Sequence, residues 1–225
     1  MLVTGFPAGM FQTNCYVVAR DDATECVVVD PGQDAAEPLA AFLADKGLTP
    51  TAVLLTHGHL DHVWNARQVC ERYAIPAYIH PEDRYMLTDP GRGIGPTLQP
   101  FLEGAEFTEP DRVIELHHGD VVTEAGIEFT VDHTPGHTQG SVVFGTVVAS
   151  AEPMRLAFTG DTLFQGSIGR TDLPGGDHEQ LLESIAARLL PLPDDTVVLP
   201  GHGGTSTIGD ERRANPFLVG LSGTR

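Results

Sequence analysis

Lysine is nearly absent from this chain of 225 residues, where it occurs once, at Lys46. Lys and Arg together number 13 against 31 Asp and Glu, which gives a formal net charge of −18 at pH 7. A protein that binds duplex nucleic acid or an anionic membrane needs a basic face to attract the negative surface. We therefore expect neither a nucleic-acid partner nor a membrane partner. Any anion must be held by Arg, His, a backbone N–H group or a metal.

Long apolar runs and paired cysteines are also missing. No stretch reaches the ~18 consecutive apolar residues of a transmembrane helix, and the first residues lack the basic and apolar regions of a signal peptide. The three cysteines, Cys15, Cys26 and Cys70, are odd in number and have no C-x-x-C spacing. This pattern favours buried thiols in a reducing compartment over a disulfide framework, so we expect a cytoplasmic protein.

What remains is an ordinary globular composition, with 41% hydrophobic and 20% charged residues. One domain over residues 1–225 is expected, because no linker separates its parts. Helices are expected at 34–46, with Asp34 as the N-cap, at 64–72 and at 177–190, and residues 89–104 read as a long loop. Two strand-rich halves, each with helices, predict helices packed outside two sheets. The strands are expected at 2–4, 16–19, 26–29, 52–55, 77–79, 113–116, 121–123, 127–131, 141–148, 156–159 and 196–199.

Four potential metal ligands, His57, His59, Asp61 and His62, fall within six positions directly after an expected strand. In an extended loop, residues i and i+2 point to the same side, so His57 and His59 can bind one ion. Asp61 and His62 come where the chain turns into a helix, so they can face a second position. The spacing therefore predicts a metal centre and differs from the helical i, i+4 pair of H-E-x-x-H.

Three further candidates share one feature, since each follows a strand-like run: His137, Asp161 and His202. Loops at the ends of core strands are where a scaffold can bring distant ligands together. Glycines beside all three would let the backbone approach an ion closely.

Seven ligands are too many for one four-coordinate ion and suit two ions that share a carboxylate. Imidazoles and carboxylates suit two divalent ions, with zinc first and iron or manganese as alternatives. The expected sites are His57, His59 and His137 for the first ion, and Asp61, His62 and His202 for the second, with Asp161 bridging. The other histidines are expected to be solvated or hydrogen-bonded: His80, His117, His118, His133 and His178.

This set of residues resembles the metallo-β-lactamase superfamily in motif types, order and spacing. The likeness runs through nearly the whole chain, from Thr13-Asn14-Cys15-Tyr16 to Asn215-Pro216-Phe217-Leu218. It implies an α+β fold, an αββα sandwich of two mixed sheets with helices on the outer faces. It also implies a metal site at one edge of the two sheets.

Within the superfamily the chain is most similar to a short, single-domain bacterial branch of glyoxalase II-like hydrolases. The segments that carry this likeness are 134–141, 158–164 and 166–176. The resemblance implies a hydrolase that cleaves an acyl-thiol such as S-lactoylglutathione by attack of a metal-bridging hydroxide. Asp61 would orient the attacking water and accept its proton.

The chain also departs from related branches. Glutathione-specific members carry a Lys and a Tyr after the bridging Asp and a C-terminal helical domain. Here residues 165–176 contain neither, and 23 residues follow His202, so glutathione is not assigned as the thiol carrier. The β-lactamases of the common dinuclear class have Arg where His62 stands and a Cys at the second metal. Flavodiiron proteins have Glu where His59 stands.

Arg170 is the candidate for binding a substrate carboxylate, because its guanidinium forms forked hydrogen bonds with such a group. The alternative is that Arg170 pairs within the chain, with Asp172 or another carboxylate. Arg212 and Arg213 are weaker candidates for the same role.

Two other functions stay open. A mononuclear iron persulfide dioxygenase of the same fold keeps the same motif, and its iron is bound by residues matching His57, His137 and Asp161. A non-catalytic metal-binding module is disfavoured, because storage needs neither an open coordination position nor a long candidate lid at 89–104. The sequence leaves the oligomeric state open.

Overall fold

The computed structural model describes residues 1–96, 99–102, 104–148 and 153–219. In this part of the chain the strands form two six-stranded mixed sheets and one small hairpin. The first sheet has the order β1 (Leu2–Ala8), β2 (Thr13–Ala19), β3 (Glu25–Val29), β4 (Thr49–Leu54), β5 (Ala77–Ile79) and β6 (Val113–Glu115). The second has the order β14 (Ser206–Thr207), β13 (Val197–Pro200), β10 (Met154–Gly160), β9 (Val142–Val148), β8 (Ile127–His133) and β7 (Val121–Glu124). The hairpin pairs β11 (Leu163–Phe164) with β12 (Ser167–Ile168).

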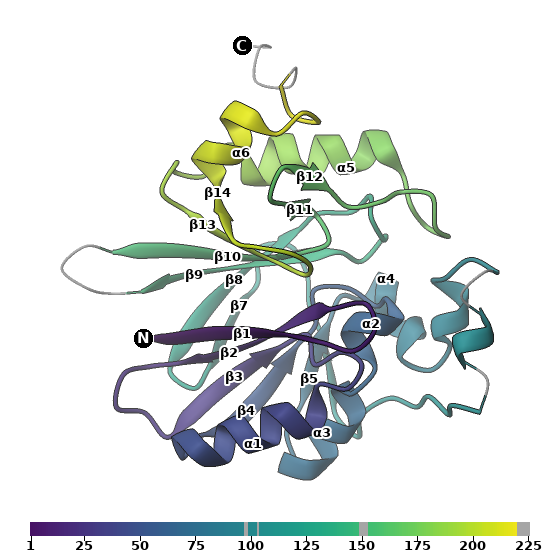
Figure 1. The fold of residues 1–225 in the computed structure, drawn as a ribbon, viewed down its shortest axis with the longest axis vertical. Helices are drawn as coiled ribbons and strands as arrows, with labels where there is room; N and C mark the ends of the chain where they lie inside the picture. The colour runs from purple at the N-terminus through teal and green to yellow at the C-terminus, as the bar shows by residue number, and fades with distance from the viewer. Residues whose placement is uncertain (97–98, 103, 149–152, 220–225) are drawn as a thin grey trace.

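The helices lie on the outer faces of the two sheets, so the molecule has four layers (Figure 1). On the first sheet these are chiefly α1 (Ala36–Lys46) and α3 (Ala66–Tyr73), and on the second α5 (His178–Ser184) and α6 (Ile208–Ala214). Short helices α2 (Leu60–Val63) and α4 (Pro81–Arg84) lie at the edge. Single turns complete the set: η1 (Tyr85–Leu87), η2 (Pro90–Arg92), η3 (Gln99–Leu102) and η4 (Ile185–Leu189). The predicted αββα sandwich is confirmed.

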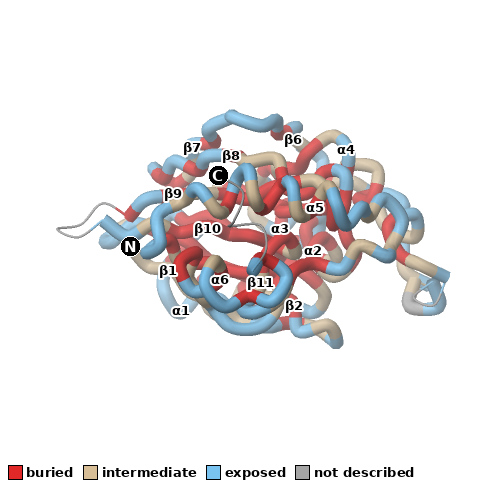
Figure 2. The backbone as a smooth tube through the Cα atoms, turned by 90° about the horizontal axis from the view of Figure 1, so that it is seen from above, coloured by how far each residue is buried: buried red, intermediate tan, exposed pale blue. Residues whose placement is uncertain are grey.

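Alternation along the strands builds three hydrophobic layers, because successive side chains point to opposite faces of a sheet. In β2, Val17 packs under the first helical layer while Val18 faces the other sheet. In β9, Val143 faces the second helical layer while Phe144 joins Val18 between the sheets. Accordingly, the residues coloured as buried lie mainly along strands in the interior of the molecule, and exposed residues surround them (Figure 2).

Several predicted bounds were wrong. Asp34 is not the N-cap of α1: its backbone is left-handed (φ 59°), the N-cap is Ala35, and no side chain caps the helix. The helix expected at 64–72 is α3, which begins two residues later, at Ala66, and the separate short helix α2 precedes it. The helix expected at 177–190 begins correctly, with Asp177 accepting a hydrogen bond from the Gln180 N–H, but ends in the π-helical turn η4.

Residues 89–104 were expected as a loop, yet η2 and η3 lie within them, and positions 97, 98 and 103 fall outside the described residues. The short strands of the hairpin and β14 were not predicted, since two residues carry no readable alternation. The three cysteines are free and buried, as expected. Among the described residues, no helix is both long and apolar enough to span a bilayer.

Candidate metal centre

The first four candidate ligands lie on one loop and the helix that it enters. The chain leaves β4 at Leu54, and His59 is the extended N-cap residue of α2 (φ −63°, ψ 145°). His57 and His59 are therefore two positions apart on extended chain. Asp61 and His62 lie in the first turn of α2, as the spacing predicted.

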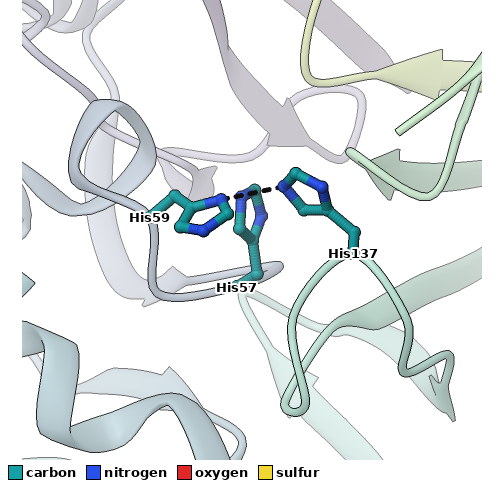
Figure 3. Close-up of side chains that lie close together, drawn as sticks. All are labelled: His57, His59 and His137. Atoms are coloured by element: carbon teal, nitrogen blue, oxygen red, sulfur yellow. Dashed lines mark hydrogen bonds between the residues drawn. The ribbon is translucent and has the colours of Figure 1, made fainter. Parts of the chain in front are cut away.

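The other three ligands come from the second sheet. His137 follows β8, Asp161 follows β10 directly, and His202 follows β13. Figure 3 shows the His137 ring reaching across from a different loop toward His57 and His59. The strand ends of two sheets thus deliver side chains to one edge of the sandwich.

Glycine permits the close approach of two of these loops. The Gly201 N–H donates to the Gly160 carbonyl oxygen at 2.8 Å, which joins the loop before His202 to the loop before Asp161. A Cβ atom at Gly201 would collide with the Asp161 carboxylate and the His62 ring. A side chain at position 201 would therefore displace two candidate ligands.

The structure brings all seven residues together. Three sets of ligand atoms each lie within 4.8 Å of one another. Asp161 lies between the sets, with its carboxylate oxygens 3.2 Å from His62 Nε2, 3.6 Å from His137 Nε2 and 3.5 Å from His202 Nε2. The sets are His57, His59 and His137; His57, His62 and Asp161; and Asp61, His62 and His202.

Four buried atoms in this cluster make no hydrogen bond within the described part of the chain: Nε2 of His57, His59 and His62, and Oδ1 of Asp161. Buried polar atoms in native proteins are nearly always hydrogen-bonded or bound to an ion. His57, His62 and Asp161, which carry three of these atoms, form one of the ligand sets, and such a set fits a divalent cation, which accepts imidazole and carboxylate ligands together.

The charges around the cluster favour a cation at its centre. Burial lowers the pKa of His57 well below its usual value, and that of His59 to about 3. Burial has the same effect on His62, but the Asp61, Asp161 and Asp30 carboxylates overcome it and raise its pKa well above normal. The carboxylates thus stabilise positive charge at this point.

The pKa shifts of Asp61, Asp161 and His202 also show that negative and positive groups stabilise one another in the cluster. Burial opposes ionisation of Asp61 and Asp161, yet His62 and His202 beside them hold the pKa of both carboxyl groups below the usual range. Burial lowers the pKa of His202, whereas hydrogen bonds to Asp161 and Asp61 raise it to about 9 overall.

Asp30, which the sequence interpretation missed, orients His62. Asp30 directly follows β3. Its Oδ2 accepts hydrogen bonds from His62 Nδ1 at 2.9 Å and from the Thr56 hydroxyl at 2.6 Å. Its Oδ1 accepts from the Thr56 N–H at 2.8 Å. A carboxylate behind a metal-binding histidine fixes the ring and leaves the other nitrogen free for the ion. Its position directly after a buried strand was the signal that could have revealed it.

Asp83 was also missed, and it holds two ligand loops together. Its buried carboxylate accepts from the Gly58 N–H at 2.9 Å, between His57 and His59. It also accepts from the Thr138 hydroxyl at 2.6 Å and from the Gly140 N–H at 2.8 Å, just after His137. Burial raises the pKa of this carboxyl group. A single side chain thereby sets the distance between the loops that carry three candidate ligands.

We expect Asp83→Asn to weaken metal binding about 10- to 100-fold, as loss of supporting hydrogen bonds does elsewhere. Each Asp83 oxygen faces a backbone N–H donor, so whichever oxygen becomes an amide NH₂ will face another donor. Competition with a chromophoric chelator measures the affinity. Glu82→Gln changes an exposed carboxylate on the same helix and should leave it unchanged. Equal affinities in the two variants would contradict this role for Asp83.

Residues at the start of β2 form hydrogen bonds that hold the loop carrying His202 in place. The Asn14 N–H donates to the Gly201 carbonyl at 2.7 Å, and its side-chain amide donates to the Pro200 and Gly203 carbonyls, both at 3.0 Å. The Thr13 hydroxyl donates to Asp61 Oδ2 at 2.7 Å. The Thr13-Asn14 segment, noted in the sequence for its likeness alone, therefore supports the second expected site.

A pocket of about 360 Å³ opens beside the cluster. Arg170 is among its lining residues, but its guanidinium forms a two-pronged ion pair with Asp172. Arg212 and Arg213 do not line this pocket, and their side chains bind Asp194 and Asp210 instead. The weaker candidates are thus engaged elsewhere. Five of the seven cluster residues line the pocket: His59, Asp61, His137, Asp161 and His202.

The remaining histidines stay outside the three ligand sets, as expected. His80 and His133 stack at 4.0 Å between ring centroids, and burial is the main cause that lowers the pKa of His80 to about 4. The ring of His133 bonds the Gln139 carbonyl at 2.8 Å. This stacked pair contributes no ligand atom to the cluster.

Comparison with known proteins places this geometry in a family. The model of the metallo-beta-lactamase superfamily matches residues 8–202. An uncharacterized protein of Mycobacterium tuberculosis, Rv2581c, is 55% identical over 99% of this chain and 100% of its own. Hydroxyacylglutathione hydrolase GloC of Haemophilus influenzae is 39% identical over 94% of this chain and 95% of its own.

Solved structures of similar proteins have the same fold. The BLEG-1 B3 metallo-beta-lactamase superposes with a TM-score of 0.82 and 41% identity, covering 96% of this chain and 99% of its own. TTHA1623 in a di-iron-bound form superposes with a TM-score of 0.78 and 36% identity, covering 96% and 100%. The second of these carries two metal ions on a closely similar fold.

Proposed function

Because the chain belongs to the metallo-beta-lactamase superfamily, we propose that it is a metal-dependent hydrolase that cleaves the thioester of a low-molecular-weight thiol, S-lactoylglutathione or a related acyl-thiol. The observation that carries the proposal is that five of the seven cluster residues line one pocket, so the cluster faces a space that can admit a substrate. Likeness to the GloC hydrolase supports a thioester as the bond that is cleaved. We place this activity in the cytoplasm.

We propose that two divalent ions occupy the cluster, zinc first, with iron or manganese as alternatives. The ligands would be His57, His59 and His137 for one ion, Asp61, His62 and His202 for the other, and Asp161 for both. Ions held in this way lower the pKa of bound water toward neutrality and polarise a carbonyl oxygen.

Asp61 is the residue to which we assign proton transfer. Its carboxylate lies at the pocket, with Oδ2 held by the Thr13 hydroxyl at 2.7 Å and lying 3.2 Å from His202 Nε2. A carboxylate fixed on one side and open on the other can orient a water and accept its proton. The neighbouring histidines keep Asp61 ionised, which this role requires.

The test is release of free thiol from S-D-lactoylglutathione by the metal-loaded protein without oxygen. We expect thiol release that depends on metal, stops with a chelator and returns when metal is added back. No release from this or any other acyl-thiol would contradict the proposal. Persulfide oxidation that consumes oxygen and needs iron would instead establish the dioxygenase alternative.

Hydrolysis of β-lactams is the second candidate, because the BLEG-1 B3 metallo-beta-lactamase is 41% identical to this chain. A chromogenic cephalosporin assayed with the same metal-loaded protein separates the two activities. A kcat/KM higher for the cephalosporin than for every thioester tested would favour the β-lactamase function.

A further inference from the structure

The pocket beside the cluster is mostly apolar. Its walls beyond the candidate ligands include Phe11, Leu60, Ile94, Phe164, Ile168 and Leu173. Among the described lining residues, Arg170 is the one lysine or arginine. A substrate carboxylate that enters this pocket therefore has Arg170 as the one guanidinium it can meet among the described lining residues.

Asp172 already binds that guanidinium. Arg170 Nε and Nη2 donate to the two oxygens of the Asp172 carboxylate, both at 2.7 Å. This is the forked geometry in which arginine binds a substrate carboxylate. One residue separates the two side chains, so Asp172 competes at a high effective concentration. The hydrogen bonds from Arg170 lower the pKa of Asp172 to about 2, so the competitor stays ionised at neutral pH.

No lysine and no second arginine line the pocket among the described residues. The chain carries a net charge of −18, and its one lysine, Lys46, lies at the end of α1. A negative field of this size repels anionic ligands at a distance. A carrier with free carboxylates, such as glutathione, gains little from this pocket, whereas an uncharged carrier meets no such repulsion.

We propose that Asp172 masks Arg170, so that the pocket selects acyl-thiols whose carrier bears no carboxylate near the sulfur. Asp172 is then a specificity-determining residue that acts through Arg170. The inference rests on the proposed thioester hydrolysis and names the class of carrier that this site accepts.

The first test compares two thioesters with the same acyl group. S-D-lactoyl-N-acetylcysteamine is uncharged, and S-D-lactoylglutathione carries two carboxylates on its carrier. With the metal-loaded wild-type protein we expect kcat/KM for the uncharged thioester to equal or exceed that for the glutathione thioester. A clear preference for the glutathione thioester would overturn the inference and leave thioester hydrolysis established. Thiol release from neither compound would overturn the proposed function itself.

The second test replaces Asp172, the residue that pairs with Arg170. In Asp172→Asn we expect kcat/KM for the glutathione thioester, relative to the uncharged one, to rise about three- to fivefold, since exposed ion pairs are this weak. The gain should come through a lower KM, because binding changes and the reacting groups do not. Adding Arg170→Gln to that variant should remove the gain. The matched control is Asp210→Asn, which breaks an exposed Arg213 pair outside the pocket and should leave the ratio unchanged.

A binding measurement gives a readout apart from turnover. S-methylglutathione has no thioester and no free thiol, so calorimetry reports on its carboxylates and amine. We expect it to bind Asp172→Asn about three- to fivefold more tightly than wild type. Equal or weaker binding, or a ratio of kcat/KM that does not rise, would show that Asp172 leaves Arg170 accessible and would overturn the inference.

Discussion

Replacement of Asp161 by asparagine is expected to lower kcat for thioester hydrolysis about 10³-fold or more, while the fold persists. Asp161 lies within 3.2–3.6 Å of ring nitrogens from His62, His137 and His202, so it contacts both expected ion sites. The amide has nearly the same shape but no charge, and its NH₂ group cannot bind a cation. Asp161 directly follows β10 and lies outside the three hydrophobic layers, so we expect the core to persist.

The measurement is thiol release at saturating substrate, with bound metal counted by elemental analysis and the fold followed by circular dichroism. Asp195→Asn is the matched control, because it makes the same chemical change at an exposed carboxylate 3.5 Å from Arg155, outside the cluster. Full turnover in a correctly folded, metal-loaded Asp161→Asn protein would refute the assignment of Asp161 as the shared ligand.

Removal of metal is expected to lower the melting temperature by about 10 °C and to abolish turnover. An ion that binds only the folded chain at 1,000 times its Kd stabilises it by about 4 kcal/mol, and each kcal/mol is about 2–4 °C at this size. The buried carboxylate of Asp30 and the half-buried carboxylates of Asp61 and Asp161 all lie within 3.5 Å of the His62 ring nitrogens. Their mutual repulsion is relieved by cations, so the stripped protein should be the less stable form.

Calorimetry of the chelated protein, before and after addition of zinc, iron(II) or manganese, measures this shift and ranks the metals. In the double variant His57→Ala/Asp161→Asn the melting temperature should respond little to added metal, since both expected ion sites lose a ligand. Identical melting curves for stripped and refilled wild-type protein would contradict a metal centre that is built into the fold.

The sequence predicted that these side chains lie together, because that prediction needed only local features of the chain. His57 and His59 had to share a side of an extended chain, and His137, Asp161 and His202 each followed a strand. Strand ends meet at the edge of a sheet, so four separate stretches of sequence could be assigned to one place before any contact was known. The layered fold followed in the same way, from short strand-like runs with helices among them.

One supporting residue, Asp83, could not be found in that way. Asp83 is one of many aspartates, and its role depends on Gly58 and Gly140, which are far from it in the sequence. Nothing local distinguishes it from the exposed Glu82 beside it. Asp34 shows the opposite error, because a residue type that favours N-caps was held in a left-handed turn by the tertiary structure. Propensity gives way wherever packing sets the backbone.

The contact between Asn14 and the loop at Gly201 also determines when the site can exist. These two residues are among the first and the last of the fold to leave the ribosome, and the chain between them supplies six of the seven candidate ligands. A nascent chain that has reached Asp161 already carries every expected ligand of the first ion site, but the second site waits for His202. Completion of the two-ion centre is therefore a late event of synthesis, and a product that ends before His202 lacks the complete centre.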